Sequence, residues 1–94
     1  MRVMWSRRAV RHLVALRDYI AQDSEQNAAL VAGRILHSVT LLATQPEMGR
    51  PGRVLGTREL VVPATGIVIP YRVRKERIEL IGVFHGQQRW PDEL

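Results

Sequence analysis

The segment that offers the most chemistry lies near the end of the chain and reads IGVFHGQQRWP, residues 81–91. His85 follows an apolar run typical of a strand, so its imidazole is expected where the chain leaves a sheet. An imidazole there can act as a general acid or base near neutral pH. It can also be a hydrogen-bonded residue that orders the segment after it. Because neither a carboxylate nor a nucleophile adjoins His85 in sequence, we favour a structural or binding role, with catalysis as the alternative.

Arginine is the second source of chemistry. All but one of the fourteen basic residues are arginine, and the formal net charge is +5. Guanidinium groups bind phosphate and carboxylate in a bidentate manner. We therefore expect an anionic partner, which could be nucleic acid, a ribonucleoprotein or an acidic protein segment. A basic surface that only keeps the protein in solution is the alternative.

Five arginines fall on predicted strands or in the loop before them: Arg50, Arg53, Arg58, Arg72 and Arg74. If they converge, they form a concavity that can hold an RNA backbone or stabilise the charge of a transferring phosphoryl group. The alternative is a solvated basic face on which they pair with Glu59 and Glu79 across strands. The sequence leaves the two interpretations equal.

Trp90 lies between Arg89 and Pro91, in a polar context that is unusual for a core tryptophan. It is either an aromatic anchor for a protein partner or a side chain that folds back over the sheet. The second arrangement is the more common one. Arg89 is grouped with Trp90 as a candidate binding residue.

Metal, redox and membrane functions are not expected. The chain has no cysteine, which excludes disulfides and thiol nucleophiles and favours a reducing compartment. His12 and His37 lie on separate predicted helices without metal-ligand spacing, so both are expected at the surface. The apolar segments are shorter than a membrane span and the N-terminus lacks a signal-peptide pattern. We expect a cytoplasmic protein without a metal site.

The elements that position these residues follow from periodicity. The length of 94 residues suits one domain, residues 1–94. Residues 2–5 could form an edge strand, and Ser6 is a candidate N-cap for a helix to about Asp23. A capping box, Asp23 to Gln26, predicts a second helix that ends near Thr44. The apolar positions of the two helices recur at spacings of three and four, which predicts a helical hairpin with facing stripes.

The rest of the chain predicts extended structure. A Pro- and Gly-rich loop, residues 45–56, precedes three β-rich runs at 60–62, 67–73 and 78–84. In the second run, alternation places Ile67, Ile69 and Tyr71 on one face. Pro70 is an awkward fit because proline belongs at a sheet edge or a bulge. The predicted order is β-α-α-β-β-β, an α+β fold with the helical hairpin packed on one antiparallel sheet.

Four segments together resemble the RelE/ParE superfamily of toxins of type II toxin-antitoxin systems: RVMWSRRAVRHLVALRDYIAQDS, GRPGRVLGTRELVV, IVIPYRV and VFHGQQRWP. The resemblance covers the chain from Val3 to Pro91, through the order and spacing of motifs that are individually loose. It implies the fold predicted above, a role in plasmid stabilisation, no cofactor, and neutralisation by an antitoxin encoded next to the toxin.

The superfamily contains two activities. RelE-like members are ribosome-dependent endonucleases that cut mRNA, whereas ParE-like members poison DNA gyrase through a protein contact. Arg58 matches an arginine common to both branches. Val68 and Gly86 stand where RelE-like members often have arginine and can have tyrosine. These departures favour a ParE-like gyrase inhibitor over an mRNA endonuclease.

The resemblance also implies partners and sites. The partners are a cognate antitoxin, in a heterotetramer or larger assembly, and DNA gyrase, or ribosome and mRNA for a RelE-like enzyme. In the RelE-like case His85, Arg58 and Arg72 would be catalytic. The residues expected to bind antitoxin or target are Arg50, Arg53, Arg58, Arg72, Arg74, His85, Arg89 and Trp90. A nucleic-acid-binding module without toxicity is a third possibility, although no groove-reading motif supports it.

Overall fold

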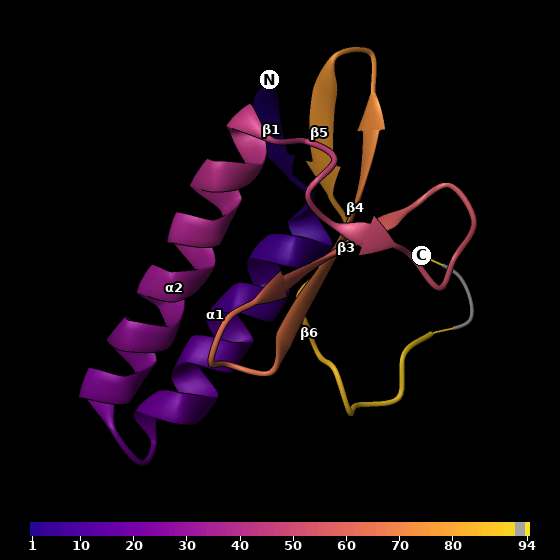
Figure 1. Cartoon of the computed structure of the whole chain (residues 1–94). Coiled ribbons are helices and arrows are strands. Elements are labelled where there is room, and N and C mark those ends of the chain that lie inside the picture. The colour runs from indigo at the N-terminus through magenta and orange to yellow at the C-terminus, as the bar shows by residue number, and fades with distance from the viewer. Residues whose placement is uncertain (92–93) are drawn as a thin grey trace.

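Two helices cover one face of a six-stranded sheet in the computed structural model, which describes residues 1–91 and 94 (Figure 1). The elements are β1 (Arg2–Trp5), α1 (Arg7–Ala21), α2 (Glu25–Thr44), β2 (Arg50–Pro51), β3 (Arg58–Val62), β4 (Ile67–Arg74), β5 (Arg77–Leu80) and β6 (Phe84–His85). The α+β class and the helical hairpin on a sheet are confirmed.

The helix starts depend on two serine caps. The Ser6 hydroxyl accepts a hydrogen bond from the Ala9 N–H at 3.0 Å, as predicted, and donates to the Ile81 carbonyl at 3.1 Å. The cap of α2 is Ser24, whose hydroxyl accepts from the Asn27 N–H at 3.1 Å. The capping box predicted from Asp23 is therefore one residue too early. Asp23 still closes the turn after α1, because its N–H donates to the Ile20 carbonyl.

The sheet is mixed, with the strand order β1-β5-β4-β3-β2 and with β6 beside β4. β1 pairs with β5 in parallel, and the other pairs are antiparallel. The prediction of an antiparallel sheet throughout is thus wrong for β1. Short turns indicate which neighbouring runs pair, but the partner of β1 comes from the opposite end of the chain.

The predicted last strand, residues 78–84, is divided into β5 and β6, and Pro70 explains the division. The Pro70 carbonyl accepts a hydrogen bond from the Ile81 N–H at 2.9 Å. The nitrogen and carbonyl of a strand residue point to the same neighbour, so the Pro70 nitrogen faces residues 81–83. Because it has no N–H to donate, the ladder is interrupted there. Proline thus lies at a break in the ladder, in keeping with its preference for irregular positions.

Burial follows the predicted alternation. Ile67, Ile69 and Tyr71 of β4 join the core beneath the helices, together with Ile35 and Leu42 of α2. A second, smaller apolar cluster lies on the other face of the sheet. Its members are Val68, Phe84 and Trp90, with Leu94 packed against them.

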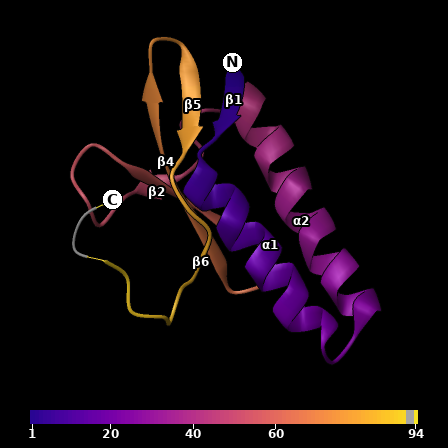
Figure 2. The same ribbon diagram turned by 180° about the vertical axis from the view of Figure 1, so that it is seen from behind.

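The face of the sheet that points away from the helices is called the open face here. The loop between β2 and β3 and the tail after β6 extend away from the helices in both views (Figures 1 and 2). Residues opposite each other on adjacent strands share a face. The register therefore forms two rows on the open face: Met4, Glu79 and Arg72, and next to it Arg2, Arg77 and Arg74.

Candidate functional site: an arginine-rich face

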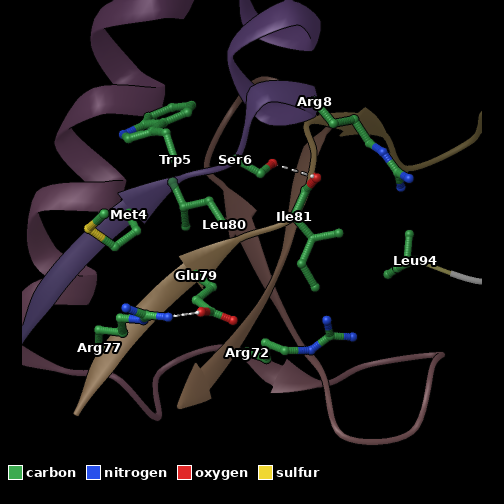
Figure 3. Close-up of a pocket in the computed structure, with 10 residues that line it drawn as sticks. All are labelled: Met4, Trp5, Ser6, Arg8, Arg72, Arg77, Glu79, Leu80, Ile81 and Leu94. Atoms are coloured by element: carbon green, nitrogen blue, oxygen red, sulfur yellow. Dashed lines mark hydrogen bonds and ion pairs between the residues drawn. The ribbon is translucent and has the colours of Figure 1, made fainter. Parts of the chain in front are cut away.

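The open face contains a depression of about 460 Å³, which we call the arginine pocket (Figure 3). Its charged lining consists of Arg8 from α1, Arg72 from β4, and Arg77 and Glu79 from β5. Its apolar lining includes Met4, Trp5, Leu80 and Ile81. Three separate elements thus bring guanidinium groups to one apolar-floored hollow.

One ion pair lies inside the arginine pocket. An Arg77 guanidinium nitrogen lies 3.0 Å from a Glu79 carboxylate oxygen (Figure 3). Among the described residues, neither Arg8 nor Arg72 forms an ion pair with an acidic side chain. Glu79 therefore pairs with Arg77 of its own strand, not across strands as the sequence allowed. The described lining keeps a surplus of positive charge.

Arg50 and Arg53 converge on Glu59 instead. Arg50 lies 3.0 Å from one carboxylate oxygen of Glu59, and the Arg53 side chain lies 3.1 Å from the other. The Arg53 backbone N–H also donates to Glu59 at 2.7 Å. The Glu59 side chain is only 3% exposed. Burial alone raises the pKa of Glu59, but the hydrogen bonds from Arg53 and Arg50 outweigh it, so this pKa is lower than usual.

Arg58 lies on the face that the helices cover. It is opposite Tyr71, whose side chain is in the core, so the two side chains share that face. The Arg58 guanidinium donates to the carbonyls of Glu47 and Gly49 at 3.2 and 2.8 Å. The Tyr71 hydroxyl holds the same loop, because it accepts from the Gly49 N–H and donates to the Pro46 carbonyl. Arg58 therefore anchors the segment after α2.

Arg72 and Arg74 share the open face, whereas Arg58 is on the opposite one. Arg50 and Arg53 form their own cluster around Glu59, and Arg74 is exposed in the row next to the arginine pocket. The five arginines that the sequence grouped together are therefore divided among three places.

Trp90 folds back onto the chain and is 9% exposed. Its ring stacks on Phe84 with a centroid separation of 4.7 Å, and its indole N–H donates to the His85 carbonyl at 3.2 Å. The Arg53 guanidinium covers the other side of the ring. Arg89 remains exposed beside it, at a shallow hollow that Arg53 and Trp90 also line.

His85 is an exposed residue of β6. Its Nδ1 accepts a hydrogen bond from the Gln87 N–H at 3.2 Å, and its own N–H donates to the Gln88 side chain at 2.8 Å. The ring lies against Gly66, where a Cβ would be 2.9 Å from Nε2, and Gly66 has a φ of +73°. Within residues 1–91 and 94, no carboxylate hydrogen-bonds to the imidazole. These contacts order the tail.

His12 is a structural residue that the sequence interpretation placed at the surface. Its Nδ1 accepts a hydrogen bond from the Val83 N–H at 3.1 Å, and its ring packs edge-on against Phe84. Burial lowers the pKa of His12, and the nearby positive charges of Arg8 and Arg11 lower it further. A signal was present: His12 is three residues after Ala9 and four before Leu16, so it shares their buried face. His37, by contrast, is exposed as predicted.

The outer side of the helical hairpin is unusually apolar. Val10, Val14 and Tyr19 of α1 are 46, 51 and 69% exposed. On α2, Leu30 and Leu41 line a groove of about 640 Å³ together with Pro63 and Ala64 of the turn between β3 and β4. Exposed apolar side chains around such a groove are typical of an interaction surface.

In the part of the chain that the structure describes, no group of three His, Asp or Glu side chains is arranged to hold a metal ion. No described helix combines the length and the apolar character that crossing a membrane requires.

Comparison with known proteins gives consistent results. The sequence model of the family described as ParE toxin of type II toxin-antitoxin system, parDE, matches residues 3–90. A candidate toxin of Sinorhizobium fredii, Y4kP, is 42% identical over 93 residues, which cover 99% of this chain and 96% of the relative. Toxin RelE2 of Caulobacter vibrioides is 35% identical over 83 residues, covering 88% of this chain and 92% of the relative.

A solved structure has the same fold. It is a chain of the chromosomal ParDE TA system from P. aeruginosa, with a TM-score of 0.80 at 26% sequence identity. The match covers 90% of this chain and 95% of that one. Because the family match also spans nearly the whole sequence, this protein belongs to the ParE family of toxins of type II toxin-antitoxin systems.

Proposed function

We propose that this toxin acts in the cytoplasm by binding DNA gyrase, and that a cognate antitoxin neutralises it. The proposal rests mainly on one observation, which is that the three residues required for a RelE-like reaction do not converge. Arg58 lies on the helix-covered face, whereas Arg72 lies on the open face. His85 pairs with Ile67, five positions from Arg72 along β4, which is roughly 16 Å at the usual rise of a strand.

Cleavage of RNA by an internal hydroxyl needs a base, an acid and stabilisation of the developing charge. The imidazole of His85 accepts a hydrogen bond from the Gln87 N–H, and an arginine is a poor proton donor because its guanidinium group stays protonated near neutral pH. The arrangement therefore offers charge without paired proton-transfer groups, which favours inhibition by binding.

The exposed apolar side chains of α1 and α2 are the surface that we propose for the target. Val14, Tyr19 and Leu30 could be buried against a protein partner without disturbing the core, since none of them belongs to it. The arginine-bearing open face, on the other side of the sheet, is proposed for the antitoxin. We propose that toxin and antitoxin assemble as a heterotetramer or a larger complex.

A ribosome-dependent mRNA endonuclease is the second candidate. Two observations favour it: the relative named RelE2, at 35% identity, and the positive charge of the open face. Arg72 would then contact RNA phosphate, with His85 as the proton-transfer group.

Two assays distinguish the candidates. Purified toxin is added to a gyrase supercoiling reaction and, separately, to translating ribosomes with end-labelled mRNA. We expect loss of supercoiling and intact mRNA, and we expect equimolar antitoxin to restore supercoiling. Site-specific mRNA cuts together with normal supercoiling would replace our proposal with the endonuclease. Light scattering of the purified complex tests the assembly.

A further inference from the structure

We infer that the arginine pocket is a subsite for a carboxylate side chain of the antitoxin, with an adjoining aliphatic side chain of the same segment on the apolar floor. The inference deepens the proposed function, because it takes the antitoxin as the occupant. It assigns a role to Arg8 and Arg72, of which Arg8 was not among the residues predicted from the sequence.

The first argument is charge. Among the described residues, the pocket is lined by three guanidinium groups and one carboxylate, and that carboxylate pairs with Arg77. Arg8 and Arg72 form no ion pair among the described residues, and they come from different elements, α1 and β4. Two guanidinium groups on either side of a hollow can both donate to one carboxylate, which is the strongest pairing available to them.

The second argument is the floor. Met4, Trp5, Leu80 and Ile81 give the pocket an apolar lining (Figure 3). Leu94, which packs against the cluster of Val68, Phe84 and Trp90, adds an aliphatic side chain to the lining. A phosphate backbone would leave such a floor uncovered, whereas an acidic residue next to a leucine, isoleucine or valine would cover it.

The third argument is position. Ser6 holds the start of α1 to the Ile81 carbonyl, so the backbone that carries Arg8 is fixed to the end of β5. The backbone of Arg72 is fixed in the β4–β5 ladder, where Arg72 lies opposite Glu79. A ligand therefore meets guanidinium groups on a scaffold that is already formed, which reduces the entropy lost on binding.

The test uses two double variants that each remove two arginines. Arg8→Gln with Arg72→Gln removes the pocket charges. Arg7→Gln with Arg11→Gln is the charge-matched control, because both residues are exposed on α1 and neither lines the pocket. Each is titrated calorimetrically with the purified protein encoded by the reading frame next to the toxin gene, and urea unfolding verifies that each variant folds.

We expect the pocket variant to raise the dissociation constant at least tenfold and the control to change it less than threefold. A single Asp→Asn or Glu→Gln change in the antitoxin should reproduce the loss, and should add little when combined with the pocket variant. As a direct readout, the Trp90→Phe protein leaves Trp5 as the single tryptophan, and its emission should shift when antitoxin binds.

Equal losses for the pocket variant and its control would overturn the inference and leave the antitoxin itself in place. Unchanged Trp5 emission on antitoxin binding would also overturn the inference. If the neighbouring protein does not bind the wild-type toxin, both the inference and the antitoxin part of the proposed function are wrong.

Discussion

The guanidinium carbon of Arg53 lies 3.5 Å from the centroid of the Trp90 ring. The opposite side of that ring stacks on Phe84, so Trp90 lies between a cation and an aromatic ring. Arg53 in turn is held by the buried Glu59. The loop between β2 and β3 and the tail after β6 therefore stabilise each other across the open face.

Trp90→Ala should lower the free energy of unfolding by about 3 kcal/mol, because it removes a large buried aromatic side chain. Trp90→Phe is the matched control and should cost about 1 kcal/mol, since it retains the stack on Phe84 and loses the hydrogen bond to the His85 carbonyl. Urea denaturation followed by far-ultraviolet circular dichroism measures both. Equal stability of Trp90→Ala and the wild type would mean that the tail does not depend on this contact.

Glu59→Gln should destabilise the fold by about 2 kcal/mol at pH 7, because two guanidinium groups lose a buried charged acceptor. The pKa of Glu59 in the fold is below its ordinary value of 4.5. Its contribution is thus fully present above about pH 4.5 and is lost as the pH falls through the folded-state pKa.

The acid limb of the stability curve should consequently be shallower in Glu59→Gln than in the wild type. Glu79→Gln provides the control, because that carboxylate is more exposed and its ion pair with Arg77 contributes at most about 1 kcal/mol. Identical acid limbs for the wild type and Glu59→Gln would contradict the assignment.

Tyr71→Phe should lower the free energy of unfolding by about 2 kcal/mol, because the Gly49 N–H and the Pro46 carbonyl each lose their hydrogen bond to the Tyr71 hydroxyl. The destabilisation should be confined mainly to the segment between α2 and β2, since both hydrogen bonds hold that segment. Hydrogen exchange should therefore be faster at Gly49 while the helices stay protected. Unchanged protection at Gly49 would show that Arg58 alone holds this segment.

His12 predicts a second dependence on pH. Its pKa is below the ordinary value of 6.5, so its contribution to stability is present above about pH 6.5 and is lost as the pH falls through the folded-state value. Protonation would set an N–H of the ring against the Val83 N–H and add a charge near Arg8 and Arg11.

The free energy of unfolding should therefore decrease from pH 6.5 downward in the wild type and decrease less in His12→Gln. Glutamine can still offer an oxygen to the Val83 N–H without titrating. Thermal melts at half-unit intervals of pH would detect the difference, and parallel curves for the two proteins would exclude His12 as its source.

His85→Ala tests the mode of action. If the toxin acts by binding gyrase, this variant should inhibit supercoiling within about fivefold of the wild type, because a binding role for one exposed ring is worth at most about 1 kcal/mol. If the wild type cleaves mRNA in the ribosome assay and this variant, still folded by circular dichroism, largely does not, the gyrase assignment is wrong. His85→Gln is the conservative companion, since it keeps an acceptor near Gln87.

The helices could be predicted from the sequence because their signals are local. The Ser6 cap, the spacing of Ala9, Leu13 and Leu16, and the proline after Thr44 all act within a few residues. The partner of β1 could not be predicted in this way. Parallel pairing with β5 depends on contacts between the two ends of the chain, for which periodicity carries no information.

The sequence predicted that arginines form the candidate site, but it did not predict which arginines lie together. Grouping arginines by charge ignored strand alternation. Arg58, Leu60 and Val62 are two residues apart and therefore share one face of β3, and Leu60 and Val62 are buried on the helix side. The pairing of Arg50 and Arg53 with Glu59 requires the loop to turn back on β3, and this follows only from the tertiary fold. Arg8 was missed because most of its neighbours in the pocket are far away in sequence.

The two edges of the sheet differ in whether another strand can pair with them. At one border β2 has two residues, and the Gly52 N–H donates to the Thr57 carbonyl, so the nitrogen of the adjacent Pro51 points outward. Without a hydrogen to offer, that border cannot serve as a template for another strand, which discourages self-association into fibres. Lateral extension is left to the opposite border, where β1 runs beside the arginine pocket.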